Sequence, residues 1–311
     1  MTDILTQLID EVGISGQEAI ELIFEQFDKH EKNPTIPAYI MATEVCSTCA
    51  PILQRRAVQY FSDILLSVST AADSGEELEE LKRAHELIIK VNGVVPDLLL
   101  NVLPLVQEEM KLDQFNVRQL ATETMAKLFA HPDTNVSEKY PSIWKTWIGR
   151  RDDKQVQLRA KWLEMCVEIY KNHPELANEV IECVKIKLAD PDEKVRCIAC
   201  KVIGEIASDS DLKQLDKSTL ELVYERTRDK KNVVRVQAMK TLGFVYDKWF
   251  NSIQSNDKLA VQKLGWIPKN LFNCLYTGDA AVLMNLEEAL FAYIFPYNED
   301  DEQRTDRLIS V

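Results

Sequence analysis

One short phrase occurs four times between residues 113 and 246 of this chain. Each copy has an acidic residue in a turn, then an apolar residue followed directly by arginine, and then a helical run. The acidic residue and the arginine of the four copies are Asp113 and Arg118, Asp153 and Arg159, Asp190 and Arg196, and Asp229 and Arg235. The arginines are 41, 37 and 39 residues apart. A period of about 40 residues with two helices per unit is typical of HEAT-type repeats, so the sequence predicts an all-α fold, an α-solenoid of HEAT-type helical repeats.

The residues after each arginine have the pattern of an amphipathic helix. Counted from the arginine, positions +7 and +10 are apolar in every copy: Met125, Leu128, Cys166, Ile169, Ile203, Ile206, Leu242 and Val245. Apolar residues at this spacing mark one buried face of a helix. Position +3 is alanine in three copies and Trp162 in the fourth, and a small residue there would let neighbouring helices approach closely.

The charged residues of the phrase have a structural interpretation. The acidic residue stands just before or at the start of the second helix of each pair, where a carboxylate can cap free N–H groups and complement the helix dipole. We expect each arginine to bond an acidic residue of its own or the next repeat, which would form a ladder along the stack. The alternative is that the arginines bind a ligand.

The 311 residues are predicted to form a single HEAT-repeat array, elongated rather than divided into globules. Within it we expect less regular repeats at residues 1–94, regular repeats at 95–250, and terminal helices with a partner site at 251–311. Pro268 predicts a break in the terminal helices near Ile267. The last apolar helix lacks a polar capping repeat, which predicts that the array is a fragment of a longer chain.

Charge and hydropathy argue against several classes of function. The formal net charge is −13, which disfavours direct binding to nucleic acid. No run of about 18 apolar residues occurs, so we expect no membrane-spanning segment. The first residues lack the basic and apolar regions of a secretory signal. The seven cysteines occupy apolar positions of helical patterns, which predicts reduced intracellular thiols.

Catalytic and metal-binding patterns are weak or missing. The pairs Cys46–Cys49 and Cys197–Cys200 have CxxC spacing, but a zinc site needs four convergent ligands and the four histidines are scattered. We therefore predict that these cysteines are core thiols and that no metal is bound. The sequence has no phosphate-binding loop, dinucleotide fingerprint, nucleophile elbow or zinc-protease motif, so we predict no catalytic residue and no enzyme.

Two basic clusters interrupt the acidic background. The first comprises Lys145, Arg150, Arg151, Lys154, Arg159 and Lys161, and the second comprises Arg226, Arg228, Lys230, Lys231 and Arg235. Both surround the turn between the two helices of a repeat. For the first cluster we favour ion pairs with neighbouring aspartates. For the second, such ion pairs and a groove for an acidic peptide or polyanion stand as equal alternatives.

Aromatic residues are also concentrated in two places. Trp144, Trp147 and Trp162 surround one repeat, and a second set, near a proline-interrupted helix, comprises Trp249, Trp266, Phe272 and Tyr276. We expect most of them to be core residues. Any that are exposed in the second set would be suitable anchors for a partner peptide.

Several ordered phrases give the chain a specific family resemblance. They are residues 95–104 (VPDLLLNVLP), 147–150 (WIGR) with Asp153, 172–177 (NHPELA), 223–230 (VYERTRDK), 266–269 (WIPK), 275–276 (LY) and 293–298 (YIFPYN). With these phrases the chain resembles the middle of the cohesin-associated HEAT-repeat regulators of the precocious-dissociation-of-sisters family, which act in sister chromatid cohesion. It resembles fungal members more than animal ones, and it looks like an internal fragment.

The resemblance implies a non-enzymatic scaffold in the nucleus, associated with chromosomes. Such proteins bind the kleisin subunit of cohesin, act with the wings-apart-like factor to release cohesin, and act with the cohesin acetyltransferase to maintain cohesion. Animal relatives also hold an inositol polyphosphate near the kleisin contact, which is the one cofactor that the resemblance implies. A release-factor contact made by the missing amino-terminal part would be absent from this chain.

By position, the resemblance implies a kleisin-binding role for the terminal helices. Tyr276 is the first candidate, with Trp266 and Lys269 beside it, and Arg226, Arg228 and Lys230 are candidates for acidic groups of a partner. The alternative function is that of a HEAT-repeat adaptor in another nuclear or cytoplasmic complex, such as a transport receptor or a phosphatase scaffold. That alternative explains the repeat period equally well but not the ordered phrases.

Overall fold

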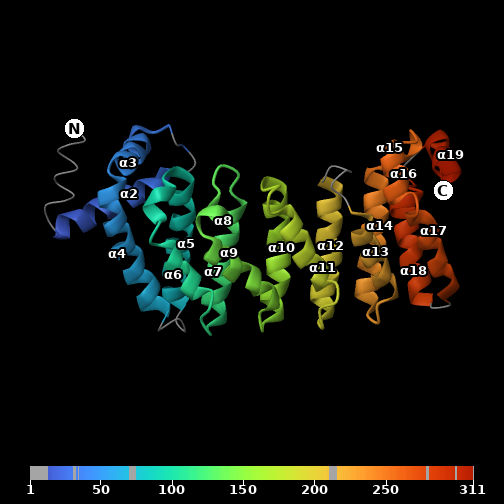
Figure 1. Ribbon diagram of the computed structural model, residues 1–311, viewed down its shortest axis with the longest axis horizontal. Helices are drawn as coiled ribbons and strands as arrows, with labels where there is room; N and C mark the ends of the chain where they lie inside the picture. Colours follow the sequence, from blue (N-terminus) through green and yellow to red (C-terminus); the bar gives the residue numbers. More distant parts are fainter. Residues whose placement is uncertain are drawn as a thin grey trace. The chain divides into compact units, whose positions relative to one another are not determined.

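The computed structural model describes residues 13–30, 33, 35–69, 75–209, 216–277, 280–297 and 300–310. All regular structure in these residues is helical, and they contain no β-strand (Figure 1). The chain divides into two compact units, residues 1–150 (unit 1) and residues 151–311 (unit 2). The prediction of an all-α fold is confirmed, whereas the subdivision at residues 94 and 250 stays a prediction.

Unit 1 packs each helix against its neighbours in the sequence. Its elements are α2 (Gly13–His30), α3 (Pro37–Thr48), α4 (Ala50–Ser69), α5 (Gly75–Val94), the 3₁₀ helix η1 (Pro96–Leu99), α6 (Leu103–Glu109), α7 (Phe115–Ala130), α8 (Val136–Lys139) and α9 (Pro141–Gly149). Helix α5 contacts α4 on one side and α7 on the other. The 3₁₀ helix η1 and the short α6 follow α5 and cover α4.

A buried polar link connects three helices of unit 1. His85 of α5 lies with its Nε2 3.1 Å from Oε2 of Glu109 on α6. Its Nδ1 lies 2.9 Å from Oγ1 of Thr124 on α7. The three side chains are at most 4% exposed. The hydrogen bond between His85 and Thr124 therefore joins α5 to α7, whereas the approach of His85 to Glu109 brings α6 close without a hydrogen bond between them.

Unit 2 continues the repeats and then the terminal helices. Its elements are η2 (Arg150–Asp152, which begins at the unit boundary), α10 (Val156–Asn172), α11 (Ala177–Lys187), α12 (Glu193–Asp209), α13 (Lys217–Glu225), η3 (Arg226–Arg228), α14 (Asn232–Lys248), α15 (Phe250–Gln254), α16 (Lys258–Leu264), α17 (Ile267–Phe272), η4 (Asn273–Thr277), α18 (Ala280–Ala289), the π-helical η5 (Leu290–Ile294) and α19 (Asp301–Ser310). The helical break expected near Ile267 is confirmed, because α16 ends at Leu264 and Pro268 stands in the first turn of α17.

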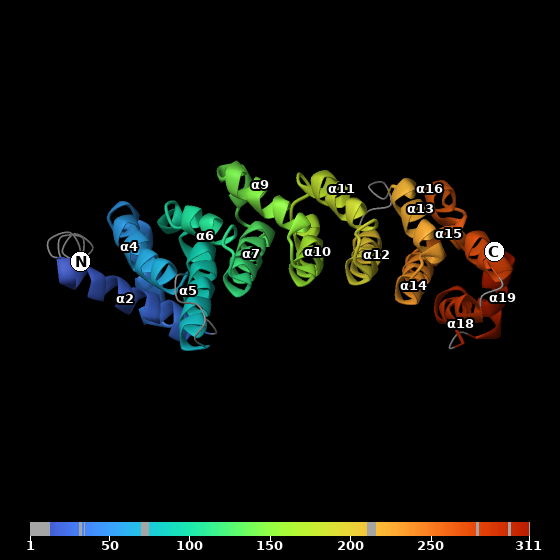
Figure 2. The same ribbon diagram turned by 90° about the horizontal axis from the view of Figure 1, so that it is seen from below.

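The second helices of successive repeats stack side by side in unit 2. Figure 2 shows α10, α12 and α14 in one layer, with α11 and α13 in the other. The eight apolar residues predicted at positions +7 and +10 are all at most 2% exposed. A Cβ on Gly204 of α12 would lie only 2.9 Å from Cγ2 of Thr241 on α14, so the absence of a side chain permits this close approach. The prediction of an α-solenoid of helical repeats is therefore confirmed.

The predicted arginine ladder is present in unit 2. Arg159 donates from Nε and Nη2 to the two carboxylate oxygens of Asp190, at 3.0 and 2.9 Å. Arg196 repeats this geometry with Asp229, at 2.8 and 2.9 Å. In both arginines Nη1 also donates to the backbone carbonyl of the acidic residue in their own repeat, at 2.9 Å for Asp153 and 2.8 Å for Asp190. Each arginine therefore joins its own turn to the turn of the next repeat.

The two outer arginines of the phrase make the same local contact. Arg118 donates to the backbone carbonyl of Asp113 at 3.1 Å, and Arg235 donates to that of Asp229 at 3.0 Å. All four copies therefore use the arginine to hold the turn that precedes their own helix.

The expected helix cap is replaced by a bond one residue earlier. The carboxylates of Asp153, Asp190 and Asp229 accept from the backbone N–H two residues later, at 2.9, 3.0 and 2.9 Å. These N–H groups belong to the residues just before helices α10, α12 and α14. The aspartate therefore closes the turn. In Asp190 and Asp229 the same carboxylate also accepts hydrogen bonds from the arginine of the preceding repeat.

Removing the charge of Asp229 should destabilise unit 2. In Asp229→Asn one side-chain oxygen can still accept from the Lys231 N–H, but the buried Arg196 loses its carboxylate. We expect a loss of about 3 kcal/mol in the free energy of unfolding, measured by urea denaturation, because breaking a buried ion pair leaves one charge uncompensated. The control is Glu182→Gln, whose 67% exposed side chain pairs with Lys185. A loss of about 0.5 kcal/mol or less is expected there, and equal losses in both variants would contradict the ladder.

Acid should weaken the same ladder. Burial by itself raises the pKa of Asp190 and Asp229, but hydrogen bonds from Arg159 and Arg196 and from backbone N–H groups outweigh it and hold both pKa values below 3.8. The stabilisation is therefore complete above the ordinary carboxyl pKa and is lost as the pH falls through the lowered values. Urea midpoints measured down to about pH 3 should fall less steeply in Asp229→Asn than in the unmodified chain, and parallel curves would refute the link.

Candidate functional site

The turn between α13 and α14 places two arginines on the surface of unit 2. Helix α13 begins after Asp216, whose side chain accepts from the Ser218 N–H at 3.1 Å. The following 3₁₀ helix η3 buries Thr227, which is 1% exposed, and therefore turns its neighbours Arg226 and Arg228 outward. The Thr227 hydroxyl donates to the backbone carbonyl of Tyr224 at 2.8 Å, which fixes the turn.

The two arginines differ in how far they are engaged within the fold. Arg226 is half-buried, donates to the backbone carbonyl of Leu188 at 3.4 Å and lies 3.6 Å from the carboxylate of Asp229. Arg228 is exposed, its guanidinium lies 5.6 Å from the centre of the Tyr224 ring, and its Nη2 donates to the Tyr224 hydroxyl at 3.3 Å. Arg228 is thus the better placed of the two to meet a partner.

Trp266 extends this arrangement into a row. Its ring meets the Tyr224 ring edge-on, with 6.0 Å between the ring centres, and Nζ of Lys217 lies 6.0 Å from the Trp266 ring. Trp266 is half-buried, and its Nε1 donates to the backbone carbonyl of Lys263 at 2.7 Å. In this row the two cations, Lys217 and Arg228, therefore flank the two neighbouring rings, and each lies at a distance where a cation and a ring attract.

Tyr276 lies on η4, which packs against the same turn. Ile267 and Leu271 of α17 are fully buried and anchor the segment that leads into η4. Sγ of Cys274 lies 3.8 Å from Oγ1 of Thr227, which joins η4 to η3. Tyr276, two residues later, is 87% exposed. An aromatic side chain with this exposure is available as an anchor for a partner.

We call these residues the aromatic–basic surface: Lys217, Tyr224, Arg226, Arg228, Lys230, Trp266, Lys269 and Tyr276. The structure brings Arg226, Arg228 and Lys230 together around one hollow, links Trp266 to Arg228 through Tyr224, and links η4 to η3 through Cys274. Lys269 is exposed on α17. The sequence prediction missed Lys217 and Tyr224. The spacing of four between Tyr224 and Arg228 on a helical turn is the signal that could have found Tyr224.

The hollow beside η3 has a volume of about 380 Å³ and a mixed lining. Its charged residues are Arg196, Arg226, Arg228 and Lys230 against Asp190, Glu225 and Asp229. Arg196 and Asp229 are already paired in the ladder. The cationic character that is available to a ligand therefore comes mainly from the exposed Arg228 and Lys230.

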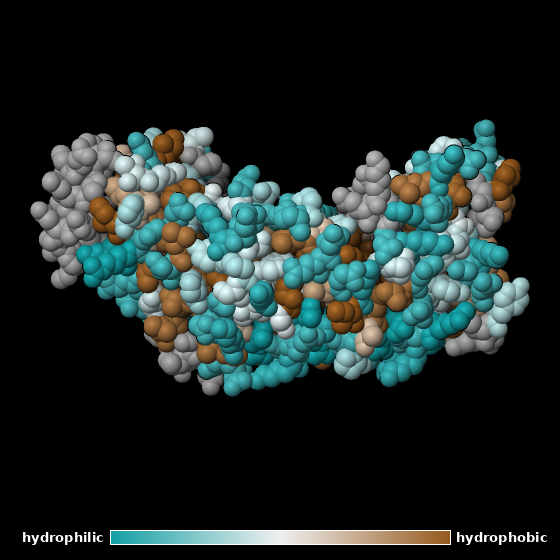
Figure 3. All heavy atoms as spheres, in the orientation of Figure 1, coloured by the Kyte–Doolittle hydropathy of each residue, from teal (hydrophilic) through white to brown (hydrophobic). Residues whose placement is uncertain are grey.

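Two residues of the first basic cluster, Arg151 and Arg159, pair with aspartates as expected, and a third, Lys161, pairs with a glutamate. Arg151 donates to Asp152 at 3.1 Å, Arg159 is in the ladder, and Lys161 lies 3.5 Å from Glu164. The tryptophans near it are core residues: Trp144, Trp147 and Trp162 are at most 5% exposed. On the face drawn in Figure 3, hydrophilic side chains predominate and hydrophobic ones are interspersed among them.

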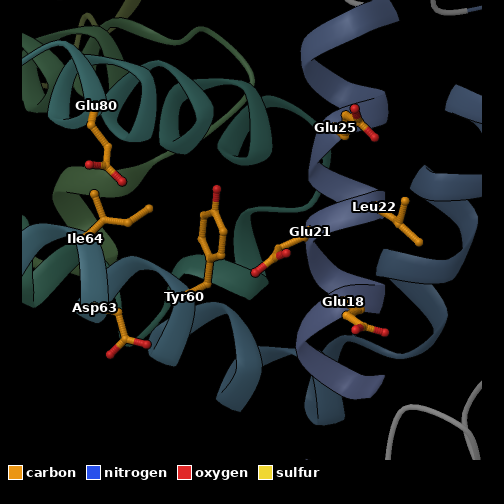
Figure 4. A pocket seen from close by; sticks show the side chains of 8 residues that line it. All are labelled: Glu18, Glu21, Leu22, Glu25, Tyr60, Asp63, Ile64 and Glu80. Carbon is orange, nitrogen blue, oxygen red and sulfur yellow. The ribbon is translucent and has the colours of Figure 1, made fainter. Parts of the chain in front are cut away.

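An acidic hollow in unit 1 was not predicted from the sequence. It has a volume of about 850 Å³ and lies among α2, α4 and α5 (Figure 4). Its lining residues are Glu18, Glu21, Leu22, Glu25, Tyr60, Asp63, Ile64 and Glu80, and none of them is basic. Five carboxylates facing one space repel phosphate groups, so this hollow is unsuited to a polyanion.

The cysteines are mostly buried thiols. Cys46, Cys49 and Cys200 are at most 2% exposed, whereas Cys197 is half-buried. Burial, with a smaller effect of Cys49, raises the pKa of Cys46 to about 12, which keeps it protonated. Cys49 lies between α3 and α4 rather than on a helix. Within the described ranges, no three His, Cys, Asp or Glu side chains are placed to share a metal ion, and no helix is long and apolar enough to cross a membrane.

Comparison with solved structures finds the same fold over the whole chain. A structure described as the Pds5–Scc1 complex, with implications for cohesin function, covers 99% of this chain and 49% of its own, with a TM-score of 0.86 and 21% sequence identity. The karyopherin Kap121p covers 99% of this chain at a TM-score of 0.50 and 15% identity. At these identities both likenesses show the fold alone.

Comparison with curated sequences is more specific. The sister chromatid cohesion protein pds5 of Schizosaccharomyces pombe is 29% identical, covering 99% of this chain and 27% of the relative. The human sister chromatid cohesion protein PDS5 homolog B is 26% identical, covering 98% of this chain and 20% of the relative. The chain thus spans about a quarter of the length of these relatives. A family model for the sister chromatid cohesion protein PDS5 matches residues 1–311. The chain belongs to the PDS5 family of sister chromatid cohesion proteins.

Proposed function

We propose that this chain is a non-enzymatic scaffold that binds the kleisin subunit of cohesin and so regulates cohesin on chromatin. Membership of the PDS5 family supports a role in sister chromatid cohesion. A solved structure of the same fold is described as a complex with Scc1, the kleisin. The observation that carries the proposal to particular residues is the 87% exposure of Tyr276 on η4, which the contact between Cys274 and Thr227 joins to the basic turn η3.

The aromatic–basic surface has the composition expected of a peptide-binding site. Tyr276 offers a large apolar contact with little loss of conformational entropy, because it has only two side-chain torsions. Arg228, Lys230 and Lys269 are exposed as well, and we propose that they meet acidic side chains of the kleisin segment. Charged groups at such a rim contribute mainly to orientation and association rate, so Tyr276 should carry most of the binding free energy.

The proposal includes the wider role of the family. The scaffold would work with the wings-apart-like factor in releasing cohesin and with the cohesin acetyltransferase in maintaining cohesion, in the nucleus and on chromosomes. Both partners act on cohesin itself, so a scaffold attached to the kleisin would bring them to their target. An adaptor of a transport receptor or phosphatase is the alternative, and the match to the PDS5 family over the entire chain argues against it.

The hollow beside η3 is the proposed site for an inositol polyphosphate. Arg228 and Lys230 are exposed there, whereas Arg226 and Arg196 are already held by carboxylates. A ligand with several phosphate groups would bring negative charge, and the exposed Arg228 and Lys230 could neutralise part of it. We assign Arg226 the supporting role of holding η3 in place through Leu188 and Asp229.

Truncating Tyr276 should disrupt kleisin binding without unfolding the chain. For Tyr276→Ala we expect at least about a 30-fold higher Kd for a purified kleisin fragment, because a central aromatic anchor contributes about 2 kcal/mol or more. Fluorescence anisotropy gives the Kd, and circular dichroism gives the melting midpoint. The control is Leu22→Ala in unit 1, whose side chain is 61% exposed. An unchanged Kd for Tyr276→Ala would remove the site assignment.

Removing the two exposed cations, Arg228 and Lys230, should weaken the binding of inositol polyphosphate. Titration calorimetry with inositol hexakisphosphate should show at least about a tenfold loss in affinity for Arg228→Ala/Lys230→Ala, because each hydrogen bond to a charged group contributes about 1.5–3 kcal/mol. The matched control is Lys82→Ala/Arg83→Ala, which removes two exposed positive charges from unit 1. Equal losses in the two double variants would indicate attraction to net charge rather than a site.

A further inference from the structure

A small pocket in unit 1 lies apart from the aromatic–basic surface in the sequence. It forms where the end of α5 meets η1, the segment after α7 and the short helix α8. Its volume is about 160 Å³, and its lining is more apolar than polar, with Leu103 and Val136 as buried members that are 1% and 4% exposed. The pocket is too small for a drug-sized ligand, which needs about 300 Å³ or more, but it can hold one aliphatic side chain.

Two polar groups in the pocket lining have no internal partner. Asn92 is only 2% exposed, and its Nδ2 makes no hydrogen bond within the described part of the chain. Oγ1 of Thr134 is likewise buried and makes no hydrogen bond to any described residue. Leaving a buried polar group unpaired destabilises a fold. Native proteins carry few such groups, so two of them in the lining of one pocket call for an explanation.

The chemistry of these groups restricts what the partner can be. Nδ2 of Asn92 can only donate, so it calls for an acceptor and cannot hold a cation. The hydroxyl of Thr134 can accept a hydrogen bond. A free anion is disfavoured because Asp133 stands exposed in the lining, and Lys139 of the lining lies 3.5 Å from the carboxylate of Asp97. A neutral acceptor and a neutral donor next to an apolar group are what a peptide backbone with an aliphatic side chain provides.

We infer that this pocket receives one leucine-sized side chain from an extended segment of a partner protein. The main-chain carbonyl next to that side chain would accept from Nδ2 of Asn92, and its main-chain N–H would donate to Oγ1 of Thr134. Nδ2 of Asn92 and Oγ1 of Thr134 would thereby gain the hydrogen bonds that the described residues do not supply. This contact would be additional to the proposed kleisin surface and uses none of its residues.

The wall formed by Tyr140 fits this assignment. Burial, with a smaller effect of Asp97, raises the pKa of the Tyr140 hydroxyl, which marks a poorly hydrated environment. Hydrogen bonds formed in such an environment are stronger than in water, because the local dielectric constant is low. A single anchored side chain with two main-chain hydrogen bonds would therefore give a weak but oriented contact, of the kind that adds to a second binding site on the same partner.

The probe is N-acetyl-L-leucine N-methylamide, titrated into the 311-residue chain with labelled leucine and valine methyl groups. We expect saturable chemical shift changes at Leu103 and Val136, with a Kd in the millimolar range. N-acetylglycine N-methylamide has the same backbone without the aliphatic group and should give no saturable change. Saturation by the glycine compound, or none by the leucine compound, would overturn the inference.

Two near-isosteric variants test the polar contacts separately. Asn92→Leu and Thr134→Val each remove one hydrogen-bonding group while roughly keeping the volume. Each variant should bind the leucine probe with about a fivefold higher Kd, because a neutral hydrogen bond contributes about 1 kcal/mol. Thermal midpoints should stay equal or rise, because an unpaired buried group is replaced by an apolar one. Unchanged affinity in both variants would refute the proposed contacts, and lower midpoints in both would show that the groups already have structural partners.

Discussion

A buried arginine that grips two carboxylate oxygens of the next repeat is the interaction on which unit 2 depends. Arg159 with Asp190 and Arg196 with Asp229 form the same two-bond geometry, and in each case the aspartate also closes the turn that leads into its helix. Charges buried in this way are favourable only when every bond is made. A shift of one repeat relative to the next would break them all, so the ladder fixes the register of the stack.

The exposed groups of the candidate site lie where the regular repeat pattern ends. Asp229, directly after η3, is buried and pairs with Arg196 of the ladder, whereas Arg228 of η3 is exposed. The proline at the start of α17 interrupts the helical run and directs the chain into η4, where Tyr276 is exposed. Buried residues that hold the scaffold and exposed residues of the candidate site therefore lie close together along the same short segments. This placement explains why the regular repeats supply the frame while the candidate site lies at their irregular end.

Much of this arrangement could be predicted from the spacing of residues. The period of the arginines identified the fold, and the apolar positions after each arginine gave the buried face, because both depend on contacts within one helix or between adjacent repeats. The prediction placed the aspartate as a helix cap, but it bonds the residue before the helix. It also missed Tyr224 and Lys217, because their importance lies in contacts with Trp266, about 40 to 50 residues further along the chain.

The sequence by itself determined the helical repeat, the buried face of each helix, the role of the arginines and the family. The first three properties follow from local periodicity, and the family follows from the order and spacing of the phrases that resemble it. Tertiary structure alone decided that Arg226 is held by Leu188 and Asp229 while Arg228 is exposed, and that Nδ2 of the buried Asn92 meets no hydrogen-bond acceptor among the described residues. The physical reason is that exposure and pairing depend on atoms contributed by distant segments, whose approach no single stretch of sequence specifies.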